Sequence, residues 1–95
     1  MSTVQLAQLL DQADAADQQH DYETAIRLYT LVVEQTEGNV ADPITREIRL
    51  AALRKTGRLL RFLGKFEASL ACYQQYYLDV GSGEQAVEAL SLLAN

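Results

Sequence analysis

The sequence predicts an all-α protein built from antiparallel helix-turn-helix units. Three observations lead to this prediction. Apolar residues recur with the period of an α-helix in several successive segments, residues that start or stop helices separate these segments, and one hairpin pattern occurs twice. The 95 residues suffice for one domain with one modest core, and they include a single proline.

The first two helices are expected to form a hairpin. Ser2 and Gln5 have the spacing of a capping box, so a first helix should begin at residue 3 and end near residues 18–20. Asp21 is a good N-cap for a second helix, which should end before Gly38. Because only about three residues connect them, the two helices must fold back on each other.

Three more helices are expected in the rest of the chain. Asp42 and Pro43 have the residue types favoured at the N-cap and first helical position, and a helical period continues to about Phe62. The stretch "LGKFE" ends this helix, and a fourth should run from Phe66 to Asp79. After "VGSGE", a fifth should run over about Ser82 to Asn95, so we expect about five helices.

The two hairpins match each other at an offset of 44 residues. Internal repeats of helix-turn-helix units indicate a stacked solenoid, in which each hairpin buries its apolar face against the next. The matching pairs are His20 and Gly64, Tyr22 and Phe66, Ala25 and Ser69, and Tyr29 and Tyr73.

These residues resemble the tetratricopeptide repeat family, in which a small residue on the second helix permits close approach and aromatic residues fill the space between hairpins. The stretch "KTGRLLRFLGKFEASLACY" is the better match, with Gly57 and Leu60 where the family has Gly and Tyr. The resemblance implies a short right-handed solenoid in one domain over 1–95. Repeat 1 would span about 3–37, repeat 2 about 43–80, and a terminal helix about 83–95.

The resemblance also implies a function. First helices of such repeats line a concave groove, so the chain is expected to be a non-catalytic protein–protein interaction module that binds a peptide or partner helix there. Arginine suits bidentate recognition of carboxylates, which favours an acidic or C-terminal peptide as the partner. The groove residues expected to contact it are Arg54, Lys55, Arg58 and Arg61 on the third helix, and Asp11 and Asp14 on the first.

A second interpretation of these charges stays open. The same 44-residue offset sets Asp11 against Lys55, Asp14 against Arg58 and Asp17 against Arg61 on neighbouring helices. The acidic and basic residues would then neutralise each other, each exposed pair contributing only ~0–1 kcal/mol. Arginines that reach past their partners could still contact a ligand.

Self-association is the alternative function. The segment "AVEALSLLAN" is apolar on more than one side, and Leu90, Leu92 and Leu93 can pack on a second copy of the chain. The pattern equally fits a segment of a longer repeat protein, cut inside a third repeat. A three-helix domain of the microtubule-interacting and transport type also resembles the first hairpin, but it leaves the second hairpin unexplained.

Composition and residue types argue against other classes. The net charge of -5 and the pI of about 4.6 disfavour nucleic acid and anionic membranes. Apolar runs are shorter than a membrane span, and the lone Cys72 has no partner for an internal disulfide, which indicates a cytoplasmic protein. His20 has no second histidine for a metal site, and no His activates Cys72, so we expect no cofactor, metal or catalytic site.

Overall fold

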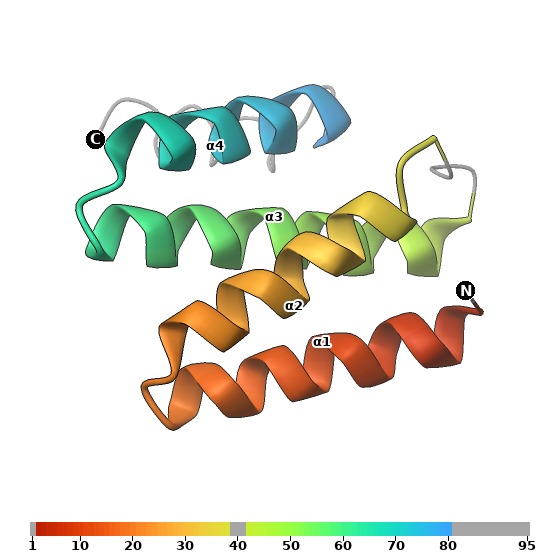
Figure 1. The fold of residues 1–95 in the computed structure, drawn as a ribbon. Coiled ribbons are helices and arrows are strands. Elements are labelled where there is room, and N and C mark those ends of the chain that lie inside the picture. The colour runs from red at the N-terminus through yellow and green to blue at the C-terminus, as the bar shows by residue number, and fades with distance from the viewer. Residues whose placement is uncertain (1, 39–41, 81–95) are drawn as a thin grey trace.

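A computed structural model describes residues 2–38 and 42–80, and these residues form four helices (Figure 1). The prediction of an all-helical fold is confirmed for them, since they contain no strand. The expected count of five is not reached, because the fifth helix was placed at 82–95, outside the described residues. The four helices are α1 (Thr3–Gln18), α2 (Tyr22–Gln35), α3 (Pro43–Phe62) and α4 (Phe66–Val80).

The helix starts follow the capping residues of the sequence. Ser2 and Gln5 form the complete capping box of α1. Asp21 and Asp42 accept hydrogen bonds from the backbone of the first turns of α2 and α3. The Thr45 hydroxyl and backbone N–H both donate to Asp42, and these bonds lower the pKa of its carboxyl group.

The two hairpin turns have the same backbone geometry. The amide of Asp21 donates to Ala16 at 2.9 Å, and the amide of Lys65 donates to Leu60 at 2.8 Å, both in the Schellman pattern that ends a helix. The residue before each amide is left-handed, with φ of 64° at His20 and 81° at Gly64. The hydrogen bonds therefore repeat at the 44-residue offset seen in the sequence.

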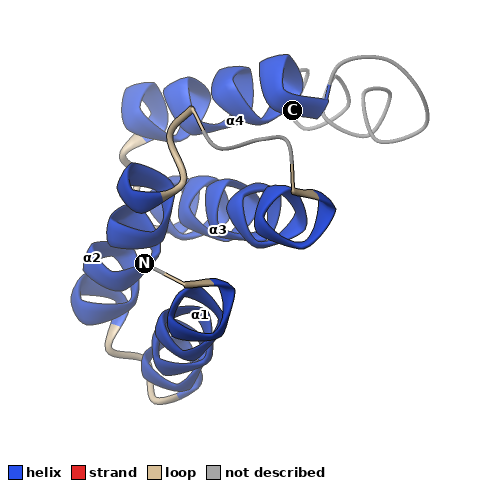
Figure 2. Cartoon of the chain, turned by 90° about the vertical axis from the view of Figure 1, so that its right-hand side faces the viewer, coloured by secondary structure: helices blue, strands red, loops and turns tan. Residues whose placement is uncertain are grey.

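α3 lies at the centre of the fold. It packs against α2 on one side and α4 on the other, and it makes a smaller contact with α1 (Figures 1 and 2). The α1–α2 turn and the α3–α4 turn lie at the same end of the molecule, on the left in Figure 1. Consecutive helices run antiparallel, so this arrangement places residues of α1 and α3 side by side.

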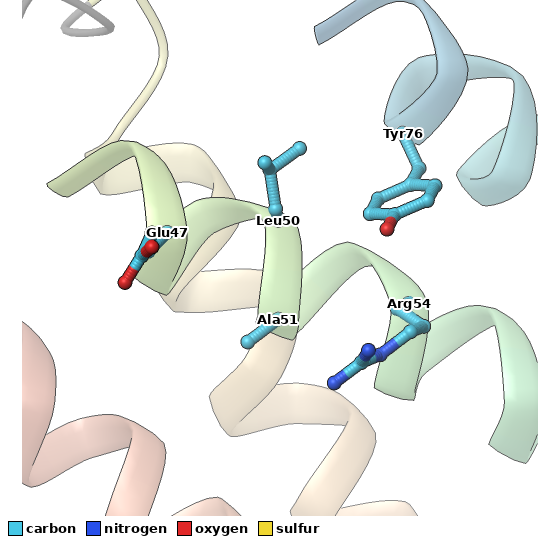
Figure 3. A pocket seen from close by; sticks show the side chains of 5 residues that line it. All are labelled: Glu47, Leu50, Ala51, Arg54 and Tyr76. Atoms are coloured by element: carbon cyan, nitrogen blue, oxygen red, sulfur yellow. The ribbon is translucent and has the colours of Figure 1, made fainter. Parts of the chain in front are cut away.

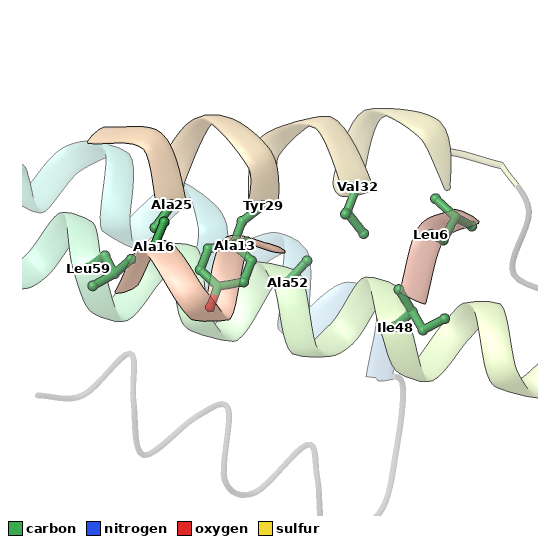
Figure 4. Close-up of a cluster of buried hydrophobic side chains, with 9 residues drawn as sticks. All are labelled: Leu6, Ala13, Ala16, Ala25, Tyr29, Val32, Ile48, Ala52 and Leu59. Carbon is green, nitrogen blue, oxygen red and sulfur yellow. The ribbon is translucent and has the colours of Figure 1, made fainter. Parts of the chain in front are cut away.

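The main core joins α1, α2 and α3 around the fully buried Tyr29 (Figure 4). Small residues surround this ring, so the helices that carry them approach closely. Full burial of a large apolar side chain stabilises a fold by about 1.5–3 kcal/mol, so this cluster stabilises the packing of the first three helices. Its members are Leu6, Ala13, Ala16, Ala25, Tyr29, Val32, Ile48, Ala52 and Leu59.

α3 and α4 approach closely at Gly57. A Cβ atom there would lie 2.7 Å from Cε1 of Tyr73, so the aromatic ring occupies the space that a side chain would need. The hydroxyl of Ser69 donates to the carbonyl of Gly57 at 2.7 Å and fixes the same contact. A second buried cluster, Leu50, Leu53, Tyr76 and Val80, continues this interface.

The α3–α4 turn provides the first testable prediction. No atom lies within 4 Å of a Cβ built on Gly64, so the cost of Gly64→Ala comes from its backbone conformation alone. We expect a loss of about 1–2 kcal/mol in the free energy of unfolding, measured by urea denaturation. Gly64→Asn should cost less, because asparagine tolerates the left-handed region better. Equal losses in both variants would show that φ at this position does not determine the effect.

Candidate partner-binding surface

Two ion pairs join the charged sides of α1 and α3. Nζ of Lys55 lies 2.8 Å from Oδ1 of Asp14, and Nη2 of Arg58 lies 2.9 Å from Oδ2 of Asp17. Their side chains are 20–63% exposed, so each pair contributes only ~0–1 kcal/mol. Acidic residues of α1 thus pair with basic residues of α3, as the second interpretation of these charges expects, for Asp14 and Asp17.

The predicted partners of these carboxylates were wrong. The sequence offset set Asp14 against Arg58 and Asp17 against Arg61, but each carboxylate contacts the basic residue three positions earlier. Such contacts depend on how far one helix is displaced along its axis relative to its neighbour. An alignment of two similar hairpins contains no information on that displacement, and three residues correspond to about one helical turn.

Tyr29 supports Asp14 from the core. Its hydroxyl donates to Oδ1 of Asp14, the same oxygen that accepts from Lys55. Burial raises the pKa of the Tyr29 phenol, and the hydrogen bond to the negative Asp14 raises it further. The neutral phenol is thus a fixed donor that orients Asp14 toward α3.

Arg54 lies apart from these ion pairs, at a small depression between α3 and α4 (Figure 3). The depression has a volume of about 190 Å³, and the ring of Tyr76 reaches into it from α4. Leu50 and Ala51 provide apolar lining beside the guanidinium of Arg54, and Glu47 closes one side. The lining of the depression thus combines apolar side chains with one arginine and one glutamate.

Arg54, Arg58 and Arg61 follow one another at helical spacing, and all three are exposed. Lys55 is directed toward α1 by Asp14. Asp11 is exposed on α1, and no contact between described residues joins it to the basic residues of α3. The residues expected to mediate self-association, Leu90, Leu92 and Leu93, lie outside the described residues.

A buried polar network around Arg49 was not anticipated from the sequence. Arg49 is only 4% exposed, and its Nε lies 2.6 Å from Oδ2 of Asp79. Its Nη1 donates to the carbonyl of Val33 at 2.7 Å and to the hydroxyl of Thr36 at 3.2 Å. One guanidinium on α3 therefore holds the C-terminal ends of both α2 and α4.

Arg46 extends this network by one helical turn. Its Nη2 donates to the carbonyls of Asp79 and Val80, at 3.0 and 2.9 Å. The last carbonyls of a helix lack intrahelical partners and carry partial negative charge, so cations are favoured there. Gln75 also donates to Asp79, at 3.0 Å.

The sequence contained two signals for this network. Arg49 stands between Ile48 and Leu50 in an otherwise apolar run, at a position that helical periodicity turns toward the core. Asp79 lies in the last turn of α4, where a carboxylate is unfavourable unless it is paired. Together they indicate a buried ion pair, although neither residue identifies the other as its partner.

Other chemically reactive residues have structural surroundings. Nδ1 of His20 lies 2.8 Å from the hydroxyl of Tyr22 in the first turn. Burial raises the pKa of the Cys72 thiol, which disfavours a nucleophilic thiolate. Within residues 2–38 and 42–80, no cluster of His, Cys, Asp and Glu has a geometry that could bind a metal ion. None of the described helices combines the length and apolarity that crossing a membrane requires.

Comparison with protein families, curated proteins and solved structures finds no match to this chain. The functional interpretation therefore rests on the residues and contacts described above.

The Arg49–Asp79 pair can be tested by removing the carboxylate. Asp79→Ala leaves a buried guanidinium without its counter-ion, so we expect a loss of about 3–5 kcal/mol in the free energy of unfolding. Asp17→Ala is the matched control, because it removes an ion-paired carboxylate whose partner Arg58 is 63% exposed. It should cost no more than about 1 kcal/mol. Similar losses in both variants would contradict the structural role of Arg49.

Tyr29 predicts a specific dependence of stability on alkaline pH. The pKa of its phenol is raised above the ordinary value of 10.0, so the folded state retains the proton more tightly than the unfolded state. This contribution to stability is complete below pH 10 and is lost as the pH rises above it. Urea denaturation of Tyr29→Phe should show a smaller loss of stability above pH 10 than the parent protein.

Tyr77→Phe is the control for this experiment, because it removes a partly buried tyrosine and leaves Tyr29 in place. It should retain the full decrease in stability at alkaline pH. If Tyr29→Phe showed the same decrease, the buried phenol would not be its source.

Proposed function

We propose that the chain is a non-catalytic protein-interaction module that binds an acidic peptide or helix on the exposed face of α3. The single observation that carries this proposal is the position of Arg54, beside the apolar lining of the depression between α3 and α4. A partner side chain could pack against Leu50 and Ala51 while an adjacent carboxylate accepts from the guanidinium. Bidentate arginine–carboxylate contacts are among the stronger polar interactions in proteins.

The distribution of charge supports an acidic partner. Seven of the eight basic residues lie between Arg46 and Lys65, a stretch with one acidic residue, Glu47. Arg46 and Arg49 are largely covered and donate to neighbouring helices, and the side chains of Arg54, Arg58 and Arg61 are exposed. A positive surface on an otherwise negative protein attracts anionic partners locally and repels them elsewhere.

The repeated hairpins support a binding role in place of a catalytic one. The two turns share their hydrogen-bond pattern, and the resemblance to tetratricopeptide repeats implies further stacking into a right-handed solenoid with a concave binding face. α1 and α3 would line that face. We place this module in the cytoplasm, where the single thiol of Cys72 would remain reduced.

Charge reversal at Arg54 tests the proposed surface. The probe is a fluorescent peptide of alternating Glu and Leu residues with a free C-terminal carboxylate, and its binding is followed by anisotropy. Arg54→Glu should weaken binding about tenfold or more, because it replaces a charge-assisted hydrogen bond by repulsion. Arg27→Glu is the matched control, since Arg27 is an exposed arginine on α2. It should leave the affinity nearly unchanged.

A peptide with an amidated C-terminus distinguishes the two kinds of acidic partner. Equal affinity of the free and amidated peptides would assign recognition to the Glu side chains. Equal weakening by Arg54→Glu and Arg27→Glu would mean that only the net charge matters, and the proposed surface would be incorrect.

A further inference from the structure

The chain leaves α4 at the edge of the depression between α3 and α4. Val80, the last residue of α4, is 5% exposed and packs in the second buried cluster with Leu50 and Tyr76. Both of these neighbours also line the depression. Nη2 of Arg46 donates to the carbonyl of Val80 at 2.9 Å. These contacts fix the point from which residues 81–95 continue.

Residues 81–95 have the composition that we propose for the partner. Their sequence, "GSGEQAVEALSLLAN", contains the acidic residues Glu84 and Glu88 and no basic residue. It also contains one valine and three leucines. The depression combines the guanidinium of Arg54 with apolar lining, so it suits a segment that offers carboxylates and large apolar side chains.

The length of chain between Val80 and Glu84 allows Glu84 to reach Arg54. Val80 packs in the same cluster as Leu50, and Arg54 lies one helical turn beyond Leu50, about 6 Å along the axis of α3. Glu84 follows Val80 by four residues, which span at most about 14 Å when extended. Two of the three residues between them are glycine, which permits backbone conformations that other residues avoid. The chain can therefore turn back toward α3 directly after α4.

The contact between α1 and α3 shows the same kind of interaction. Carboxylates of α1 pair there with basic residues of α3, Asp14 with Lys55 and Asp17 with Arg58. Arg54 lies instead where α3 meets α4 (Figure 3). An acidic segment that follows α4 would pair with α3 on this side as α1 does on the other.

We infer that residues 81–95 bind in the depression as an intramolecular ligand, with a carboxylate of Glu84 or Glu88 accepting from the guanidinium of Arg54. A short tether gives a segment an effective concentration in the millimolar range, which a separate peptide of similar affinity must exceed to displace it. The chain's own segment is therefore favoured over a separate partner. The regulatory part of this inference rests on the proposed function, because an acidic partner would have to displace residues 81–95 before it binds Arg54.

Occupation of the depression is tested in the full chain by combining Glu84→Gln with Glu88→Gln. The readout is the Nε–Hε resonance of Arg54 in isotope-labelled protein, which is identified by its loss in Arg54→Lys. We expect the double variant to shift this resonance, because the guanidinium loses its charged acceptor. Glu34→Gln combined with Glu37→Gln is the matched control, since both glutamates are exposed and their replacement removes the same number of charges. This control should leave the resonance in place.

The competition is tested with the fluorescent peptide of alternating Glu and Leu residues. The Glu84→Gln, Glu88→Gln variant should bind it about fivefold more tightly than the parent chain, because the fraction of molecules with an open site rises. The Glu34→Gln, Glu37→Gln control should change the affinity much less, which separates competition from the change in net charge. An amidated peptide with the sequence of residues 81–95 should displace the fluorescent peptide from the first of these variants.

The outcomes separate this inference from the proposed function. An Arg54 resonance that stays in place, or that shifts equally in the control, would overturn the inference whatever the fluorescent peptide does. A parent chain that forms a dimer, which Glu84→Gln with Glu88→Gln dissociates in light scattering, would also overturn it by assigning the segment to a second copy. If the resonance shifts and the fluorescent peptide binds no form of the chain, the proposed function fails and occupation by residues 81–95 stands. A shifted resonance together with tighter peptide binding would establish both occupation and competition.

Discussion

The buried guanidinium of Arg49 fixes how α2, α3 and α4 meet. Taking a cation out of water costs several kcal/mol, and this cost is offset only if the charge and its donors all find partners. Asp79, Val33 and Thr36 provide them from two different helices. A shift of α3 along its axis would break these bonds at once, so the network favours one register among the many that apolar packing alone would allow.

The same helix carries two populations of basic residues with different consequences. Arg46 and Arg49 face the ends of neighbouring helices and stabilise the fold through helix C-terminal carbonyls. Arg54 and Arg58 lie further along α3 on its exposed side. Helical periodicity separates the two groups, so one basic segment both fixes the packing and places arginines on the exposed side of α3.

Local signals made much of the fold predictable. Asp21, Asp42 and Pro43 determine helix starts through interactions within a few residues, and the boundaries of α3 agree with the prediction. The register of α1 against α3 could not be predicted from the 44-residue offset, and neither could the partners of Arg49. Both depend on distances between helices that are remote in sequence, and no pattern within a single helix records those distances.

The depression beside Arg54 depends on the packing that holds α4 against α3. Tyr76 lines the depression and also belongs to the second buried cluster, so one ring forms both the wall of the depression and part of the α3–α4 contact. The Arg49–Asp79 pair fixes the register of the same two helices. A change in that register would therefore displace the Tyr76 ring relative to Arg54, and the depression would change shape together with the packing.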